Sequence, residues 1–122
     1  MGGPAKPATV LVVDDDDSMR LLCRVNLELE GYRVIEANTV EGAKEQMALE
    51  PVRVVLLDVH VGPDDGRVLV QEIRSEHPDV AVAFLTGTAD LQELAKVEAD
   101  GILGKPFSLD DLSSLVGRLA TA

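Results

Sequence analysis

Aromatic residues and cysteine are scarce in this sequence of 122 residues. Aromatics make up 2% of the chain, so aliphatic side chains must form the core, and a chain of this length is large enough to bury one. The single cysteine, Cys23, cannot form an internal disulfide, which is typical of a reducing cytosol and indicates a cytoplasmic protein. We expect Cys23 to fill space within a helix rather than to act as a redox centre.

Positive charge is also in short supply, with 11 basic against 22 acidic residues and a net charge of −11. An acidic surface repels phosphate backbones, so we expect no direct binding of nucleic acid. Long apolar runs and the apolar centre of a signal peptide are absent from the sequence, so we expect no membrane insertion. Residues 1–8 are rich in Gly, Pro and Ala and are expected to form a flexible leader before one domain over residues 9–120.

Strand-like and helix-like segments alternate five times along the chain. The expected strands are residues 10–13, 32–37, 52–57, 80–85 and, more weakly, 101–104. The expected helices run from Ser18 to a stop at Gly31, over 40–49 with Thr39 as N-cap, over about 67–76, over a short stretch around 91–97, and onward from Ser108, whose spacing to Asp111 fits a capping box. This alternation predicts an α/β domain with a parallel sheet and helices on both faces.

The apolar residues at helical spacing indicate which side of each helix faces the sheet. They are Met19, Leu22, Leu29 and either Val25 or Asn26 in the first helix, Val40, Ala43, Met47 and Leu49 in the second, Val68, Leu69 and Ile73 in the third, and Leu112, Leu115, Val116 and Leu119 in the last.

Polar residues that follow the apolar strands are the candidate site, because ligands of such folds bind beyond the carboxyl ends of the strands. These residues are Asp14 and Asp15 after the first strand, Asp58 after the third, Thr86 after the fourth and Lys105 after the fifth. We expect them to meet in one shallow pocket.

The chemistry of these side chains is mutually consistent. Crowded carboxylates repel one another unless a cation neutralises them, and oxygen ligands favour Mg²⁺. The Asp58 carboxylate can form an acyl phosphate, and a bound Mg²⁺ stabilises charge during phosphoryl transfer. Lys105 and the Thr86 hydroxyl can contact phosphate oxygens. Each residue alone has an ordinary explanation, such as helix-start acids for Asp14 to Asp17, but together they indicate one function.

The segments "LVVDDDDSMR", "LLDVHVGPDDG", "FLTG" and "GKPF", in this order, resemble the receiver domain of bacterial two-component response regulators. The resemblance implies a flavodoxin-like sheet of five strands in the order 2-1-3-4-5. It implies that Asp58 accepts a phosphoryl group from a sensor histidine kinase or phosphotransfer protein. It also implies that Asp14, Asp15, Asp58 and the backbone carbonyl of His60 bind Mg²⁺.

The same resemblance implies that Thr86 is the switch hydroxyl and Lys105 the phosphate-binding lysine. Such a domain catalyses only its own phosphorylation and dephosphorylation, and it signals to a downstream protein or to an output domain missing from this sequence. The sequence does not name the kinase or the output, and it leaves open whether the protein forms a homodimer.

Three features depart from the family pattern. Gly62, followed by Pro63, stands four residues after Asp58, where the family usually has a proline. Ile102 stands where many members have a tyrosine or phenylalanine that rotates inward on activation. The segment between the switch hydroxyl and the lysine is a few residues shorter than usual, so its helix is expected to be short, shifted or partly unwound.

Other classes of function stay open. A Mg²⁺-dependent phosphohydrolase also places an acid after an apolar strand, but such enzymes commonly have a second acid where this chain has His60. A phosphate-independent interaction module is favoured by Ile102 and disfavoured by the intact acids, Thr86 and Lys105. A nucleotide-binding fold is weakest, because the first strand leads into acids instead of a glycine-rich loop.

Overall fold

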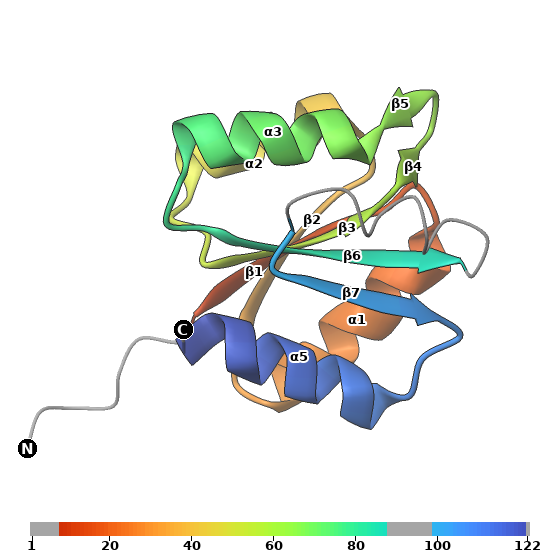
Figure 1. The fold of residues 1–122 in the computed structure, drawn as a ribbon. Coiled ribbons are helices and arrows are strands. Elements are labelled where there is room, and N and C mark those ends of the chain that lie inside the picture. Colours follow the sequence, from red (N-terminus) through yellow and green to blue (C-terminus); the bar gives the residue numbers. More distant parts are fainter. Residues whose placement is uncertain (1–7, 88–98, 122) are drawn as a thin grey trace, which may run out of the picture.

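The computed structural model of the chain describes residues 8–87 and 99–121. Its centre is a parallel sheet of five strands (Figure 1). The strands are β1 (Thr9–Val13), β2 (Arg33–Ala37), β3 (Val54–Asp58), β6 (Ala81–Gly87) and β7 (Gly101–Lys105). Their order is β2-β1-β3-β6-β7, which confirms the expected order 2-1-3-4-5. The numbering differs because β4 (His60–Val61) and β5 (Asp64–Asp65) form a separate antiparallel pair.

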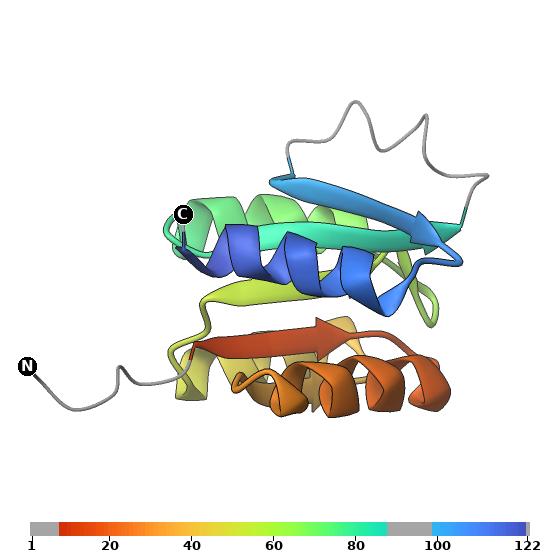
Figure 2. The ribbon, with the colours of Figure 1, turned by 90° about the horizontal axis from the view of Figure 1, so that it is seen from below.

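Helices cover both faces of the sheet. Helices α2 (Val40–Leu49) and α3 (Gly66–Glu76) lie on one face, and α1 (Asp17–Leu29) and α5 (Leu109–Thr121) lie on the other (Figures 1 and 2). The helix expected around residues 91–97 and most of the leader expected over residues 1–8 lie outside the described residues. Within the described part of the chain, every helix is too short or too polar to cross a membrane.

The central strands form the core because both of their faces are covered. All five residues of β1 are buried, and so are the first four of β3. The edge strand β2 has an exposed residue at its start and a buried one at its end. Fully apolar strands are what a doubly covered parallel sheet requires, and this explains why the apolar runs of the sequence located the strands.

Side-chain caps fix where the helices begin. The Thr39 hydroxyl accepts a hydrogen bond from the Gly42 N–H at 2.9 Å, and the Ser108 hydroxyl accepts one from the Asp111 N–H at 3.0 Å, so both expected caps are present. Asp16 caps α1 and Asp65 caps α3 in the same way. Asp65 also belongs, with Asp64, to the short strand β5.

The predicted apolar face of α1 was right for Met19, which packs against the core, and wrong for most of the other residues. Cys23 and Leu27 are its buried residues, whereas Leu22, Val25 and Leu29 are 44%, 50% and 82% exposed. The helix carries two apolar rows at helical spacing, and only one of them can face the sheet.

Two further residues that were predicted to face the sheet, in the helices on its opposite face, are exposed. Leu49 lies at the end of α2 and is exposed. Val68 of α3 is exposed, and Val70 is buried beside Leu69 and Ile73. In α5 the four buried residues are the four that the spacing predicted.

Candidate metal centre

Three carboxylates converge where the central strands end. Asp14 follows β1 directly, Asp15 is next to it, and Asp58 is the last residue of the neighbouring strand β3. One carboxylate oxygen from each of these residues lies within 4.8 Å of the others. The strands run in parallel, so their carboxyl ends share one edge of the sheet (Figure 2). The structure thus brings together the acids that the sequence singled out.

Lys105 extends between two of these acids. Its Nζ lies 3.2 Å from Asp14 Oδ2 and 3.1 Å from Asp58 Oδ2. The Asp14 side chain is almost fully buried, whereas the Asp58 and Lys105 side chains are 18% and 24% exposed. The ammonium therefore neutralises part of the negative charge of the cluster.

Burial dominates the electrostatics of Asp14. Desolvation raises the pKa of its carboxyl, and the Asp16 N–H and the Lys105 ammonium only partly oppose this effect. For Lys105, desolvation alone would lower the pKa, but attraction to Asp14 and the hydrogen bond to Asp58 outweigh it and raise the pKa. A buried carboxylate whose charge is disfavoured gains from a further cation nearby, so the cluster suits a positively charged ligand.

Backbone N–H groups hold an oxygen of each carboxylate. Asp14 Oδ1 accepts a hydrogen bond from the Asp16 N–H at 2.9 Å, and Asp58 Oδ1 accepts one from the His60 N–H at 3.2 Å. Asp15 is exposed, and its Oδ2 accepts one from the Gly62 N–H at 3.2 Å. The acids are therefore oriented by the loops that follow β1 and β3.

Arg20 of α1 contacts the backbone of Asp14, and the sequence did not predict this contact. Its Nη1 donates to the backbone carbonyl oxygen of Asp14 at 2.7 Å, and its Nε donates to Glu36 Oε1 of β2 at 3.2 Å. The Arg20 guanidinium also pairs with Asp17. The sequence signal was weak, since an arginine one turn into a helix is ordinarily solvated.

Gly66 permits a close approach between the start of α3 and the end of β3. A Cβ atom at this position would lie 2.3 Å from the backbone carbonyl oxygen of Asp58. The Gly66 N–H also donates to the carbonyl oxygen of Val59 at 2.6 Å. Glycine here lets α3 begin directly against the strand that carries Asp58.

Thr86 and Ile102 lie on the neighbouring strands. Thr86, in β6, is 1% exposed, and its hydroxyl donates to the carbonyl oxygen of Gly87 at 3.5 Å. Ile102, in β7, is 37% exposed and pairs in register with Phe84. Thr86 shares a face with Phe84, because side chains two residues apart on a strand point to the same side. Ile102 lies beside Phe84 in the sheet, so Thr86 and Ile102 are on the same side. His60 is exposed, with its backbone N–H on Asp58.

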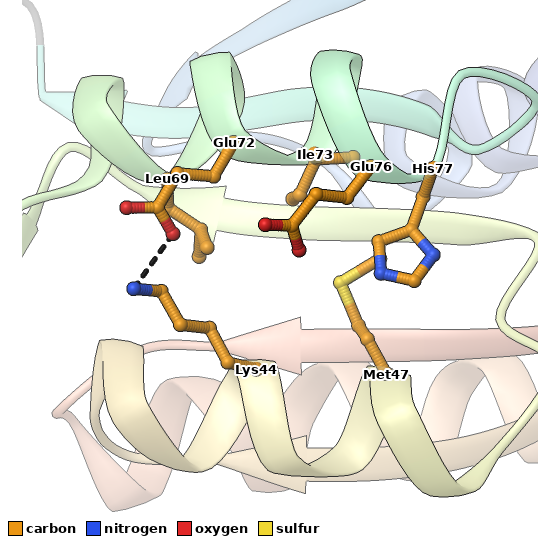
Figure 3. A pocket seen from close by; sticks show the side chains of 7 residues that line it. All are labelled: Lys44, Met47, Leu69, Glu72, Ile73, Glu76 and His77. Atoms are coloured by element: carbon orange, nitrogen blue, oxygen red, sulfur yellow. Dashed lines mark ion pairs between the residues drawn. The ribbon is translucent and has the colours of Figure 1, made fainter.

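A separate small pocket lies between α2 and α3 (Figure 3). Lys44 of α2 and Glu72 of α3 are paired across it, with 2.6 Å between Nζ and Oε2. Met47 and His77 lie at its other end. None of the strand-end side chains lines this pocket, so the candidate chemistry is not located there.

The donor set of the strand-end cluster fits a hard divalent cation. It offers carboxylate oxygens and no thiolate or imidazole among the three clustered side chains. Oxygen ligands suit Mg²⁺ and Ca²⁺, whereas Zn²⁺ sites are usually built from Cys and His. The cluster can therefore hold a metal ion beside the partly exposed Asp58.

Comparisons with known proteins identify the family that this chain resembles. The sequence model of the response regulator receiver domain matches residues 10–117. The sensor kinase CckA of Brucella abortus is 38% identical over 118 residues, which is 92% of this chain and 12% of that protein. The probable transcriptional regulator ycf27 of Cyanophora paradoxa is 34% identical over 113 residues, and the chain spans 47% of its length.

A solved structure adds a comparison in three dimensions. The response regulator TrrA of Thermotoga maritima, crystallised in complex with Mg²⁺ and BeF, has a TM-score of 0.84 and 29% identity. The match covers 92% of this chain and 98% of that one.

Proposed function

We propose that Asp58 is the residue that accepts the phosphoryl group in this chain. The chain belongs to the response regulator receiver domain family, whose members are phosphorylation-dependent signalling switches. The observation that carries the proposal is the position of the Asp58 carboxylate, at the end of a buried strand and 3.1 Å from the Lys105 ammonium. An incoming phosphoryl group would meet a carboxylate nucleophile and a cation in one place. Receiver domains are switches rather than enzymes with a separate substrate, and the chemistry proposed here takes place on the chain itself.

We propose that the metal ion is Mg²⁺ and that Asp14, Asp15, Asp58 and the backbone carbonyl of His60 hold it. Support comes from the oxygen-only cluster and from the Mg²⁺ in the TrrA complex. When bound, Mg²⁺ offsets the negative charge that spreads over the phosphoryl oxygens during transfer. The raised pKa of Asp14 fits this assignment, because a cation would favour its charged form.

Lys105 and Thr86 would respond to the new charge. Phosphorylation of Asp58 gives Lys105 an additional anionic partner, and the Thr86 hydroxyl can turn from Gly87 to donate to a phosphoryl oxygen. These movements would change the outer surface of β6 and β7. Ile102 lies on the same face and would report the change by repacking, since it has no aromatic ring to rotate.

A sensor histidine kinase or phosphotransfer protein is the proposed donor, which would place the domain in the cytoplasm. The exposed apolar residues of α1, namely Leu21, Leu22, Val25 and Leu29, are a candidate contact for this donor. They belong to the helix that starts directly after the acids, and a protein that delivers a phosphoryl group to Asp58 must cover the surface around it. The receiver of a longer protein and a stand-alone regulator are both compatible with these features.

One labelling experiment tests the proposed function. The wild type, incubated with acetyl phosphate and Mg²⁺, should gain one phosphoryl group, which intact-protein mass spectrometry would detect. Asp58→Asn should gain none, and removal of Mg²⁺ with EDTA or the substitution Asp15→Asn should abolish labelling. Lys105→Ala should respond more weakly than Lys44→Ala, because Lys44 pairs with Glu72 away from the acids.

Other outcomes would point elsewhere. A wild type that resists every small phosphodonor would favour a phosphate-independent interaction module. Steady turnover of unrelated phosphomonoesters would favour a hydrolase.

A further inference from the structure

The loop between β3 and α3 contains a tight turn that faces Asp15. His60–Val61 pairs with Asp64–Asp65 in antiparallel register, so Gly62 and Pro63 are the two central residues of a hairpin. Gly62 has a φ of +59°, and it is the first of the two. A positive φ in a hairpin turn favours glycine at that position.

Steric space is not the reason for glycine at this position. A Cβ atom built on Gly62 would meet nothing within 4 Å in the part of the chain that the structure describes. The requirement is conformational, since most residues with a side chain avoid the left-handed region. In this conformation the Gly62 N–H donates to Asp15 Oδ2 at 3.2 Å.

Asp15 differs from the other two acids in how it is held. Asp14 is buried and contacts both the Asp16 N–H and Lys105, and Asp58 contacts the His60 N–H and Lys105. Asp15 is exposed, and its carboxylate is tied to the loop by Gly62. An exposed carboxylate without a fixed partner samples several rotamers, and the ordering of such a side chain opposes metal binding.

The turn itself is anchored at both ends. Val61, directly before it, is 1% exposed and belongs to the core formed with α3. Asp65, just after it, caps α3 through the Arg67 N–H at 2.9 Å. The position of the Gly62 N–H is therefore set by the core and by the start of a helix.

We propose that the Gly62–Pro63 turn is a positioning element for the metal ligand Asp15, which holds its carboxylate in the orientation that Mg²⁺ requires. The inference rests on the proposed function, because it assumes that the acids bind Mg²⁺. The resemblance noted from the sequence places a proline at this position in most members, and a proline has neither the N–H nor the positive φ. A member with proline at this position therefore cannot form this contact.

Three substitutions of Gly62 separate the conformation from the donor. Gly62→Pro removes both, Gly62→Ala keeps the N–H but disfavours the positive φ, and Gly62→Asn keeps both, because asparagine tolerates the left-handed region. Isothermal titration of the metal-free proteins with MgCl₂, without phosphodonor, gives the affinity. Loss of one solvent-exposed hydrogen bond of ordinary strength predicts that Gly62→Pro binds Mg²⁺ roughly three- to tenfold more weakly, with Gly62→Asn within about twofold of the wild type.

A second titration with CaCl₂ distinguishes positioning from general damage. Mg²⁺ demands near-ideal octahedral geometry, whereas Ca²⁺ accepts flexible ligands, so Gly62→Pro should weaken Mg²⁺ binding more than Ca²⁺ binding. Equal Mg²⁺ affinity in Gly62→Pro and the wild type would overturn the inference and leave the proposed function standing. So would equal losses for both ions, or a Gly62→Asn variant as weak as Gly62→Pro. A wild type that binds no Mg²⁺ would overturn the proposed metal site as well.

Discussion

Arg20 Nη1 lies 2.7 Å from the backbone carbonyl oxygen of Asp14, and the same guanidinium donates to Glu36 on the edge strand β2. One largely buried arginine, with 13% of its side chain exposed, thus links the start of α1, the end of β1 and the sheet edge. It fixes the main chain at the point from which Asp14 and Asp15 project. The acids are consequently positioned from both sides, by Arg20 behind them and by the loop after β3 in front.

Replacement of Arg20 tests this support. Arg20→Met removes the hydrogen bonds to the Asp14 carbonyl and to Glu36, and we expect the free energy of unfolding to fall by about 1–3 kcal/mol. Arg24→Met is the matched control, because Arg24 is 45% exposed and its pairs with Glu28 and Glu36 should contribute less than about 1 kcal/mol. Urea denaturation of metal-free protein measures both, and equal losses would show that Arg20 has no special role.

Substitution of Gly66 should displace the backbone at the end of β3, which carries Asp58. A Cβ on Gly66 would collide with the Asp58 carbonyl oxygen at 2.3 Å, and a backbone atom cannot turn aside as a side chain can. We expect Gly66→Ala to cost about 1–3 kcal/mol of stability and to reduce labelling by acetyl phosphate. Gly87→Ala, where a Cβ would meet nothing within 4 Å among the described residues, should change the stability by less than about 0.5 kcal/mol.

The buried thiol of Cys23 should be inert at neutral pH. Burial raises its pKa from 9.0 to about 11, so almost no thiolate is present near pH 7. We expect very slow reaction with a disulfide reagent such as DTNB in the native protein and rapid reaction once urea unfolds it.

The same shift predicts how stability depends on pH in the alkaline range. The folded-state pKa lies above the ordinary value, so the contribution of Cys23 is complete below about pH 9 and is lost as the pH rises toward 11. Cys23→Ala should therefore lose less stability than the wild type between pH 8.5 and pH 10.5 in urea titrations. Parallel curves for the two proteins would contradict the assignment.

The apolar row on α1 predicts a difference between protein and small-molecule donors. Leu22→Ser and Val25→Ser alter residues that are 44% and 50% exposed, so the fold should tolerate them. With a sensor histidine kinase that phosphorylates the wild type, we expect the double variant to be labelled at least severalfold more slowly, because apolar contact area is lost. Labelling by acetyl phosphate should be unchanged. Equal rates with the kinase would remove α1 from the proposed contact.

The strand ends could be predicted from the sequence because burial on both faces leaves a plain signal. Each central strand is an apolar run, and the first polar residue after it must lie at the sheet edge. This reasoning placed Asp14, Asp58 and Lys105 at the carboxyl ends of the strands, where the structure brings them together. The order of the strands came from the family resemblance, since the apolar runs do not state which strands are neighbours.

The hydrogen bonds that orient the acids could not be predicted in the same way. Arg20 and the Gly62 N–H act through backbone atoms, and every residue offers a carbonyl and nearly every residue an N–H, so composition gives no signal for them. The buried face of α1 was missed for a different reason. Leu22 and Leu29 are more hydrophobic than Cys23, and only the packing of the whole domain shows that the smaller residue faces the sheet.

Lys105 belongs to the edge strand β7, whereas its carboxylate partners lie at the ends of two inner strands, Asp58 as the last residue of β3 and Asp14 directly after β1, with β6 between β7 and these strands. Its side chain thus reaches past β6, the neighbour of β7 in the sheet, to the acids at the centre. Added negative charge at Asp58 would act on the Lys105 ammonium, and thus on the end of β7, directly and without intervening side chains. The β7 edge is therefore where a partner protein could sense the state of a residue that it never touches.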